Sequence, residues 1–363
     1  MMRSPNIVIM AGGTGGHIFP ALAVADVLRN RGHQVTWIGT RQGLEARLVP
    51  AAGIPMEWID VGGVRGKGVF TLLKAPFTLT RALTQALGIF RRLKPAAALG
   101  MGGFASGPGG LAARLSGCPL VLHEQNAVPG VTNRILSRLT QNVLEGFPGS
   151  FAPGRHARHV GNPVRAAIAA LPAPAQRFAG RSGPARLLII GGSQGARVLN
   201  ENLPAAVSLL KLRGAPVEVL HQTGARDLDM VQAGYKEHGV EARVAPFIDD
   251  MAAAYAWADL AVCRAGALTL AELEAAGLGA VLVPFAAAVD DHQTRNAAFL
   301  VEQGAARLLP QSRATPERLA SELGELVDDR AAMQAMAEHA RAVARTDAAE
   351  QVADLCLAAG GLA

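Results

Sequence analysis

The sequence predicts an α/β protein with two lobes, each built on a mainly parallel sheet with helices on both faces. Short apolar runs recur along the chain with helical stretches between them, which is the pattern of a doubly wound sheet. A glycine-rich loop follows an apolar run and precedes a helical pattern at residues 12–17 and again at residues 191–196. With 363 residues, the chain is long enough for two domains, each with its own core.

The first half alternates short apolar runs with helical patterns. We expect strands at residues 6–10, 34–38, 96–99, 120–123 and 142–144. We expect helices at residues 19–30, 108–115 and 131–137. This half is predicted to form an N-terminal domain of residues 1–163, because the turn at 161–163 is where we expect the chain to change lobe.

The second half repeats this alternation and is predicted to form a domain of residues 164–340. Its expected strands are residues 187–190, 217–221, 243–245, 260–262 and 280–283. Its expected helices are residues 197–211, 249–256, 269–276 and 293–302. The proline-containing stretch 171–175 is a plausible linker, and the alanine-rich tail from Pro316 predicts two or three further helices.

Composition narrows the class of protein. Half of the residues are hydrophobic and only 4% are aromatic, which excludes a disordered chain. Cys118, Cys263 and Cys356 lie far apart, which predicts a reducing compartment and no zinc site. Pro5 and Asn6 interrupt the apolar region that a signal peptide needs, and no apolar run reaches the ~20 residues of a membrane span. We therefore expect a cytoplasmic protein.

The net charge of +6 is distributed unevenly. Between Asp60 and Glu124 there is no acidic residue, and this window holds eight cations, among them Lys74, Arg91 and Lys94. Aliphatic residues and phenylalanines are interleaved with the cations over 69–93, a pattern that favours contact with an anionic membrane surface. The alternatives are an ordinary helix pair with a basic outer face and, less favoured without Tyr or Trp stacking platforms, a nucleic-acid site.

The glycine loops predict anion binding, because glycine lets the backbone approach a phosphate and the first helical N–H groups favour negative charge. A third glycine-rich stretch, 100–108, also lies between a strand and a helix. Ile18 occupies the third glycine position of a dinucleotide fingerprint, which argues against NAD. Gly66-Lys67 lacks the remainder of a P-loop, which excludes ATP hydrolysis by that device.

Polar residues gather after several of the predicted strands. His17 follows Thr14 at the start of the first helix, and the run 123–126 (His-Glu-Gln-Asn) follows an apolar strand, where unpaired polar groups would be costly without a polar ligand. Arg165 follows a turn and is suited to bind phosphate. Glu272 lies within the first two turns of a predicted helix, and residues 290–296 supply further polar groups. Asp227 and Asp229 are interpreted as acids at a helix start rather than as metal ligands.

Six of these motifs occur in the order of a known family. They are residues 12–17, 100–108, 123–126, 161–165, 191–197 and 264–269. Together they resemble the bacterial peptidoglycan N-acetylglucosaminyltransferases, family 28 glycosyltransferases of the GT-B architecture, over residues 5–350. The resemblance implies two Rossmann-like domains facing a cleft, with a C-terminal helix (341–363) that packs back on the N-terminal domain. It also implies transfer of GlcNAc from UDP-GlcNAc to the C4 hydroxyl of MurNAc in undecaprenyl-diphospho-MurNAc-pentapeptide.

Carried over motif by motif, the resemblance implies a donor site for UDP-GlcNAc. Its residues would be Thr14, Gly15, Gly16, Asn126, Arg165, Ser193, Ile248, Ala267, Leu268, Thr269, Leu270, Ala271, Glu272 and Gln293. Within this set Ser193 would meet the diphosphate, Ile248 the uracil and Glu272 the ribose. Gly13, Gly102 and Gly103, together with His17, would face the acceptor diphosphate. Ala265 departs from the family pattern, where serine is common, and removes one hydroxyl contact.

The implied mechanism is an inverting transfer without cofactor or metal, in which helix N-termini stabilise the charge of the departing UDP. His17 is our candidate general base, because an imidazole ordinarily titrates near neutral pH. The implied location is the cytoplasmic face of the bacterial inner membrane, with proteins of cell-wall synthesis as further partners and no nucleic acid. A UDP-GlcNAc epimerase of the same architecture and a nucleotide-sugar-binding module without turnover stay as alternatives; the basic, apolar 69–93 segment favours the transferase.

Overall fold

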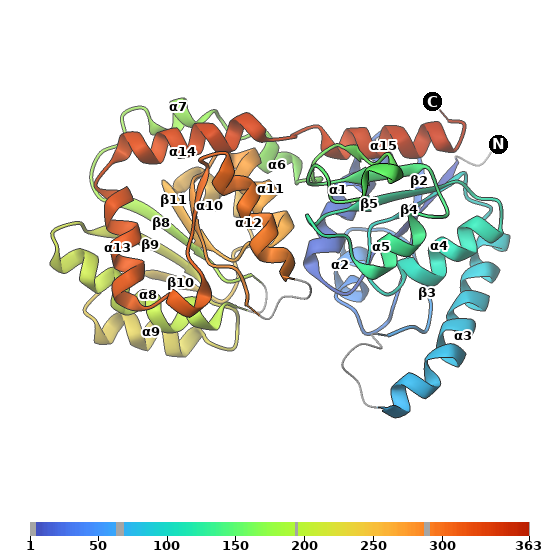
Figure 1. Ribbon diagram of the computed structural model, residues 1–363, viewed down its shortest axis with the longest axis horizontal. Coiled ribbons are helices and arrows are strands. Elements are labelled where there is room, and N and C mark those ends of the chain that lie inside the picture. Colours follow the sequence, from blue (N-terminus) through green and yellow to red (C-terminus); the bar gives the residue numbers. More distant parts are fainter. Residues whose placement is uncertain (1–4, 63–68, 193–194, 287–290, 363) are drawn as a thin grey trace. The chain divides into compact units, whose positions relative to one another are not determined.

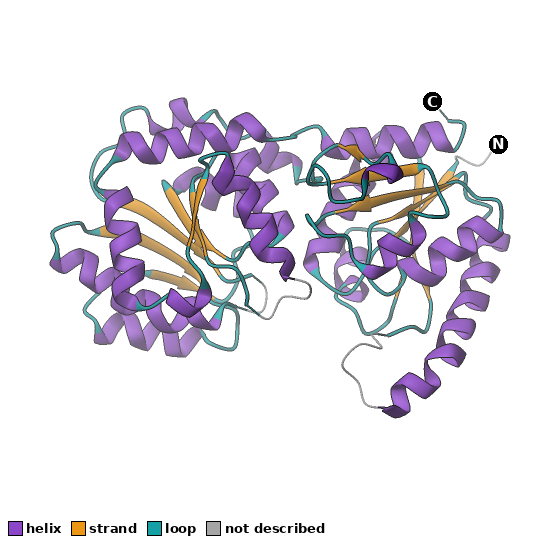
Figure 2. Ribbon diagram, in the orientation of Figure 1, coloured by secondary structure: helices purple, strands orange, loops and turns teal. Residues whose placement is uncertain are grey.

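The computed structural model describes residues 5–62, 69–192, 195–286 and 291–362, and for residues 69–75 it describes the backbone alone. The chain forms two compact units (Figure 1). Unit 1 comprises residues 1–165 and 346–363, and unit 2 comprises residues 166–345. Each unit is a sheet with helices on both sides (Figure 2).

Unit 1 contains a seven-stranded sheet in the order β3-β2-β1-β4-β5-β6-β7, and every pairing is parallel. The strands are β1 (Asn6–Met10), β2 (Gln34–Gly39), β3 (Met56–Trp58), β4 (Ala97–Gly100), β5 (Leu120–Glu124), β6 (Asn142–Glu145) and β7 (Arg158–His159). The helices are α1 (Gly15–Asn30), α2 (Glu45–Ala51), α3 (Val69–Leu93), α4 (Ser106–Leu115), α5 (Val131–Leu136) and α15 (Ala348–Ala359). Strand order reverses between β1 and β4, the point at which open α/β sheets bind ligands.

Both faces of this sheet are covered because its strands are apolar on both sides. On β1, Ile7 and Ile9 pack into one core cluster, and Val8 and Met10 pack into another on the opposite face. The first cluster includes residues of α1 and α15, and the second includes residues of α3 and α4. Figure 1 shows α15, at the end of the chain, lying along α1. The last described helix is thus part of the core of unit 1.

Unit 2 contains a six-stranded parallel sheet in the order β10-β9-β8-β11-β12-β13. The strands are β8 (Ala185–Ile190), β9 (Val217–Gln222), β10 (Arg243–Ala245), β11 (Leu260–Cys263), β12 (Ala280–Leu282) and β13 (Ala306–Leu308). The helices are α6 (Ala166–Ala169), α7 (Pro174–Phe178), α8 (Arg197–Leu212), α9 (Leu228–Glu237), α10 (Met251–Trp257), α11 (Ala267–Ala276), α12 (His292–Glu302), α13 (Pro316–Val327) and α14 (Arg330–Val343). Its strand order reverses between β8 and β11. The predicted class of two doubly wound parallel-sheet domains is confirmed.

Most predicted elements are present, and the differences have simple physical causes. Helix α1 begins at Gly15 rather than at Phe19, because the Thr14 carbonyl accepts from the N–H groups of His17 and Ile18 (3.1 and 3.3 Å). Strands β3, β7 and β13 were not predicted. Two or three residues show little pattern, although the three-residue strand β10 was predicted. The interpretation of Asp227 as an acid at a helix start is confirmed, because it is the N-cap of α9.

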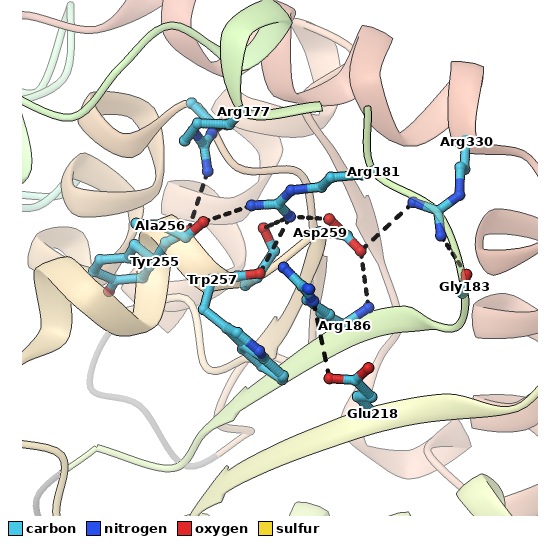
Figure 3. Close-up of polar contacts among 12 residues, drawn as sticks. Arg177, Arg181, Gly183, Arg186, Glu218, Tyr255, Ala256, Trp257, Asp259 and Arg330 are labelled. Carbon is cyan, nitrogen blue, oxygen red and sulfur yellow. Dashed lines mark hydrogen bonds and ion pairs between the residues drawn. The ribbon is translucent and has the colours of Figure 1, made fainter. Parts of the chain in front are cut away.

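Arginine side chains bind the C-terminal end of α10 in unit 2 (Figure 3). Arg181 donates to the last carbonyl groups of the helix and pairs with the buried carboxylate of Asp259. Asp259 also accepts from the backbone N–H of Arg186 at 2.9 Å and lies 3.9 Å from a guanidinium nitrogen of Arg330. Because cations favour helix C-termini, this cluster stabilises the turn that leads from α10 into β11.

A second arginine extends this anchoring to α11. Arg177 donates to the carbonyl oxygens of Tyr255 (3.1 Å) and Ala276 (2.7 Å), which lie near the ends of α10 and α11. Burial, with the nearby Arg181 and Arg341, lowers the pKa of Arg177 to about 10. The guanidinium still keeps its charge at neutral pH, so the two helix ends are held by a permanent cation.

We predict that Asp259→Ala destabilises the protein by about 3–5 kcal/mol, because it leaves the largely buried Arg181 without its counter-ion. Glu325→Ala is the matched control in the same unit. Glu325 is 62% exposed and its partner Arg307 keeps Glu322, so the expected loss is below about 1 kcal/mol. Urea unfolding followed by circular dichroism measures both variants. Equal midpoints would contradict the role assigned to Asp259.

Candidate functional site

A buried carboxylate, that of Glu45, accepts a hydrogen bond from the backbone of the first glycine loop (12–17) of unit 1. Gly13, with φ +90°, donates its N–H to Glu45 Oε2 at 3.0 Å. Glu45 is fully buried at the start of α2 and also accepts from the N–H and the hydroxyl of Thr40 (3.0 and 2.8 Å). The Gly13 N–H is therefore already bonded, and the first amides of α1 at Gly15 and Gly16 are the donors that the helix itself does not use. Sequence reasoning missed Glu45, since one acid in an unpredicted helix gave no signal.

The glycine-rich loop 100–108 packs directly on the loop 12–17. A Cβ added to Gly103 (φ +84°) would lie 2.2 Å from the carbonyl oxygen of Gly12. A Cβ added to Gly102 (φ +97°) would lie 3.0 Å from Cε1 and Nδ1 of His17. Only glycine fits these positions, for both steric and conformational reasons. The structure thus brings Gly13, Gly102, Gly103 and His17 together at the strand reversal.

The polar run 123–126 begins within β5, and its buried side chains find hydrogen-bond partners within the protein. His123, Glu124 and Gln125 are 0%, 2% and 1% exposed. The Glu124 carboxylate accepts from the backbone N–H groups of Asn126 and Gly130 (3.0 and 3.1 Å) and from Asn133 Nδ2 (3.0 Å). The expectation that the whole run needs a polar ligand was wrong, because its buried side chains bond other groups of the protein instead. Asn126 is the half-buried member of the run.

His17 belongs to the same cluster. Its side chain is half-buried, and Nδ1 lies 2.8 Å from Gln125 Oε1. Arg165, the last residue of unit 1 before the chain enters unit 2, lies over the ring of Phe19 on α1 with its guanidinium carbon 5.7 Å from the ring centre. Thr14, Gly15, Gly16, His17 and Arg165 therefore all lie around the N-terminal turns of α1.

Unit 2 contains a pocket of about 750 Å³ at its own strand reversal. Gly191, Gly192, Gly195 and Ala196 of the glycine loop 191–196 form one wall, and the turn before α11 forms another. The lining residues are Ile190, Gly191, Gly192, Gly195, Ala196, Arg197, Val198, Glu201, Arg226, Asp227, Arg264, Gly266, Thr269, Phe285, Gln293 and Gln311. A Cβ at Gly195 would lie 2.2 Å from the carbonyl oxygen of Thr223, so this loop also requires glycine. Ser193 lies outside the described residues.

Arg264 supplies a fixed positive charge to this pocket. Its Nη1 donates to the carbonyl oxygens of Val283 and Pro284 (3.0 and 3.3 Å), and its guanidinium carbon lies 5.3 Å from the ring centre of Phe285. Burial lowers the pKa of Arg264, which stays a cation at neutral pH. Arg264 stood within a motif of the sequence but was not among the predicted site residues; the signal available was an arginine directly after a strand at a glycine turn.

The remaining predicted residues of unit 2 divide into two groups. Thr269 and Gln293 line the pocket, and Gln293 Oε1 accepts from the N–H of Phe285 at 2.9 Å. Ile248, Ala267, Leu268, Leu270, Ala271 and Glu272 do not belong to the pocket lining. Glu272 is 5% exposed, and the hydroxyl of Tyr255 donates to its Oε2 at 3.0 Å. The ribose contact assigned to Glu272 stays a prediction.

The basic, apolar segment of unit 1 is one helix, α3, rather than a helix pair. Ala86, Ile89 and Phe90 in its C-terminal half pack in the core, whereas Phe77 is 76% exposed. Exposed apolar side chains continue on α4, which packs on α3, and on α5, which packs on α4. We call this set the apolar surface; its members are Phe77, Leu79, Leu111, Leu115, Val131 and Ile135. Among the described residues, no helix has the length and apolar character to span a bilayer.

Comparisons with known proteins agree with this architecture. Residues 7–145 match the model of the glycosyltransferase family 28 N-terminal domain, and residues 186–352 match that of the family 28 C-terminal domain. A protein of Nitrosococcus oceani named UDP-N-acetylglucosamine–N-acetylmuramyl-(pentapeptide) pyrophosphoryl-undecaprenol N-acetylglucosamine transferase is 57% identical over 352 residues, covering 97% of this chain and 98% of the relative. A protein of Xanthomonas axonopodis pv. citri with the same name is 58% identical, covering 98% and 82%.

Solved structures show the same relationship. The crystal structure of Acinetobacter baumannii MurG is 43% identical and matches with a TM-score of 0.85, covering 98% of this chain and 99% of that one. The Staphylococcus aureus MnaA–UDP structure, 14% identical with a TM-score of 0.66, shares the fold alone. The two domain models together match well over half of the chain, so this protein belongs to glycosyltransferase family 28.

Proposed function

We propose that this protein transfers GlcNAc from UDP-GlcNAc to the C4 hydroxyl of MurNAc in undecaprenyl-diphospho-MurNAc-pentapeptide, with inversion at the anomeric carbon. The observation that carries the proposal is the pocket of unit 2, where glycine amides, the N-terminus of α11 and Arg264 surround a space suited to a diphosphate. The names of the relatives specify GlcNAc transfer to a pyrophosphoryl-undecaprenol acceptor. They do not favour the epimerase alternative.

Unit 2 is proposed to bind the donor, and unit 1 is proposed to bind the acceptor and to supply further donor contacts. In unit 2, Thr269, Gln293 and Arg264 bind the donor, with Ser193, Ile248 and Glu272 as further donor contacts. In unit 1, Gly102 lies beside His17 and Gly103 beside Gly12, and both glycines are proposed to face the acceptor. The N-terminal turn of α1, with Thr14, Gly15 and Gly16, together with Asn126 and Arg165, completes the donor site in this proposal.

In the proposed reaction His17 accepts the proton of the acceptor hydroxyl as that oxygen bonds to the anomeric carbon. The bond between this carbon and the diphosphate breaks at the same time, and UDP leaves with the electron pair. Backbone N–H groups and the Arg264 guanidinium stabilise the charge on the departing diphosphate. Each of these tasks is assigned to a group of the chain itself.

The proposed location is peripheral, on the cytoplasmic face of the bacterial inner membrane, because the acceptor is a membrane lipid. The apolar surface on α3, α4 and α5 supports this proposal, and cations such as Arg91, Arg114 and Arg134 lie on the same helices. Two cations of the acid-free window are paired, Arg81 with Asp60 and Arg92 with Glu57. Proteins of cell-wall synthesis are further proposed partners.

The test of the function is incubation with labelled UDP-GlcNAc in metal-free buffer, with and without the lipid-linked acceptor. Label that reaches the lipid only when acceptor is present supports the transferase. Conversion of the sugar without acceptor would establish the epimerase instead, and binding without conversion would establish a nucleotide-sugar-binding module.

We predict that His17→Ala lowers kcat at least about tenfold with little change in UDP-GlcNAc affinity, because general base catalysis acts on the chemical step. Steady-state kinetics and calorimetric titration with UDP-GlcNAc measure the two quantities. His238→Ala, at an exposed position after α9, is the control with an expected kcat close to that of the unaltered protein. Near-normal turnover in His17→Ala would remove His17 from the mechanism.

We predict that Arg264→Ala weakens UDP binding about tenfold or more, since a hydrogen bond to a charged group contributes about 1.5–3 kcal/mol. Calorimetric titration with UDP measures this loss of affinity. Arg318→Ala removes an exposed arginine of α13 in the same unit and is expected to leave UDP binding unchanged. If both variants bind UDP equally well, the diphosphate does not contact Arg264.

We predict that Phe77→Ser combined with Leu115→Ser lowers binding to anionic vesicles at least about tenfold, since fully burying one such side chain contributes about 1.5–3 kcal/mol. Vesicle co-sedimentation measures the partition coefficient. Leu212→Ser, which alters a leucine 79% exposed on α8 of unit 2, is the control. A double variant that binds vesicles as tightly as this control would show that the apolar surface does not contact lipid.

A further inference from the structure

A chain of hydrogen bonds connects the half-buried His17 to the interior of unit 1. His17 Nδ1 lies 2.8 Å from Gln125 Oε1, Gln125 Nε2 lies 3.0 Å from His123 Nδ1, and His123 Nε2 lies 2.8 Å from the carbonyl oxygen of Gly161. His123 and Gln125 are 0% and 1% exposed. Because water reaches neither side chain, the protein groups around them determine which atom carries the proton in each hydrogen bond.

The buried end of this chain of hydrogen bonds, at His123, determines which atom donates and which accepts in every bond. The carbonyl oxygen of Gly161 can only accept, so His123 Nε2 carries a proton and donates it. Burial lowers the pKa of His123 to about 4, so the ring is neutral at physiological pH. A neutral imidazole with its proton on Nε2 has a lone pair on Nδ1, and His123 Nδ1 therefore accepts.

The orientation of the Gln125 amide then determines whether His17 donates or accepts. Its Nε2 donates to His123 Nδ1 at 3.0 Å and to the backbone carbonyl oxygen of His123 at 3.1 Å. The reversed amide would direct its oxygen at two acceptors, so Oε1 must be the atom that faces His17. Since an amide oxygen only accepts, His17 Nδ1 must donate to it. Asn162 Nδ2 donates to the Gln125 carbonyl oxygen at 3.0 Å and holds the backbone in place.

We propose that Gln125 and His123 are positioning residues that hold the neutral His17 ring with its proton on Nδ1 and its lone pair on Nε2. Gly102 leaves room for the ring, since a Cβ at this position would lie 3.0 Å from its Nδ1 and Cε1 atoms. The catalytic consequence rests on the proposed function: Nε2 is then the atom that accepts the proton of the acceptor hydroxyl. The resulting imidazolium keeps its Nδ1–H bond to Gln125, so no second proton moves.

An amide suits this position better than a carboxylate would. A carboxylate beside His17 would add a negative charge to a site that is proposed to receive a diphosphate. It would also lack the N–H that His123 Nδ1 accepts. A neutral amide fixes the tautomer without either cost, because one end only donates and the other only accepts.

The direct test is the tautomer of His17 in the full-length protein without substrate. Two-bond 1H–15N spectra of protein carrying 15N-labelled histidine are recorded at pH 8.5, well above the ordinary imidazole pKa of about 6.5. The His17 signals are those that disappear in His17→Gln. We expect a protonated Nδ1 and an unprotonated Nε2. A protonated Nε2 would overturn the proposal.

Two substitutions of Gln125 separate positioning from packing. Gln125→Met keeps the size of the side chain but cannot accept from His17, so His17 should shift towards the Nε2–H form, with kcat at least about tenfold lower and KM for UDP-GlcNAc changed less than about twofold. Gln125→Glu keeps an acceptor for Nδ1 and should preserve the Nδ1–H signal. Gln85→Met on α3, where Gln85 bonds Asp60, is the matched control and should alter neither spectrum nor kcat.

An unchanged His17 spectrum in Gln125→Met would overturn the proposal. If Gln125→Met does not fold, the spectra of the unaltered protein and of Gln125→Glu still decide it, since loss of the Nδ1–H signal in Gln125→Glu also contradicts it. The proposed function fails in a different way: full turnover in His17→Ala with an Nδ1–H signal in the unaltered protein would reject His17 as base and support the tautomer assignment.

Discussion

The close backbone contact between Gly103 and Gly12 is the constraint on which the geometry of unit 1 depends. Strands β1 and β4 are neighbours at the reversal of strand order, so the loops that follow them leave the sheet side by side. A side chain on Gly103 would collide with the Gly12 carbonyl oxygen, and one on Gly102 would collide with His17. Ser106 Oγ lies 2.7 Å from the carbonyl oxygens of both Met10 and Gly102 and joins the two loops from the buried side. The position of the His17 ring follows from these contacts.

The sequence predicted the fold class, the central strands and the glycine loops, because apolar runs and glycine clusters can each be recognised along the chain without knowledge of the fold. The strands at 6–10 and 187–190 are mostly apolar runs that lead into glycine loops, and each is the first strand of its sheet in chain order. Among the edge strands, β10 was predicted, whereas β3, β7 and β13 were not. Their few residues show little pattern, and pairing with a neighbouring strand defines them.

The site was predicted less completely than the fold. Motifs singled out Thr269 and Gln293, which line the pocket of unit 2, and His17, which lies at the loops of unit 1. The sequence could not distinguish residues that face a ligand from residues that hold a loop. Glu124 is the clearest example, since its carboxylate closes the turn that follows β5. Glu45 bonds Gly13 and Arg264 bonds the backbone carbonyl of Val283, both far away in the sequence. A pattern of residue types along one sequence does not reveal such contacts.

The return of the chain to unit 1 has a consequence for biosynthesis. Val352, Cys356 and Leu357 of α15 belong to the same core cluster as Ile7 and Ile9 of β1. Residues 166–345 are therefore an insertion within unit 1, and that unit can complete its core only after the whole of unit 2 has been translated. Until then one face of the first sheet lacks part of its apolar cover, so the nascent N-terminal half exposes apolar surface while unit 2 is being made.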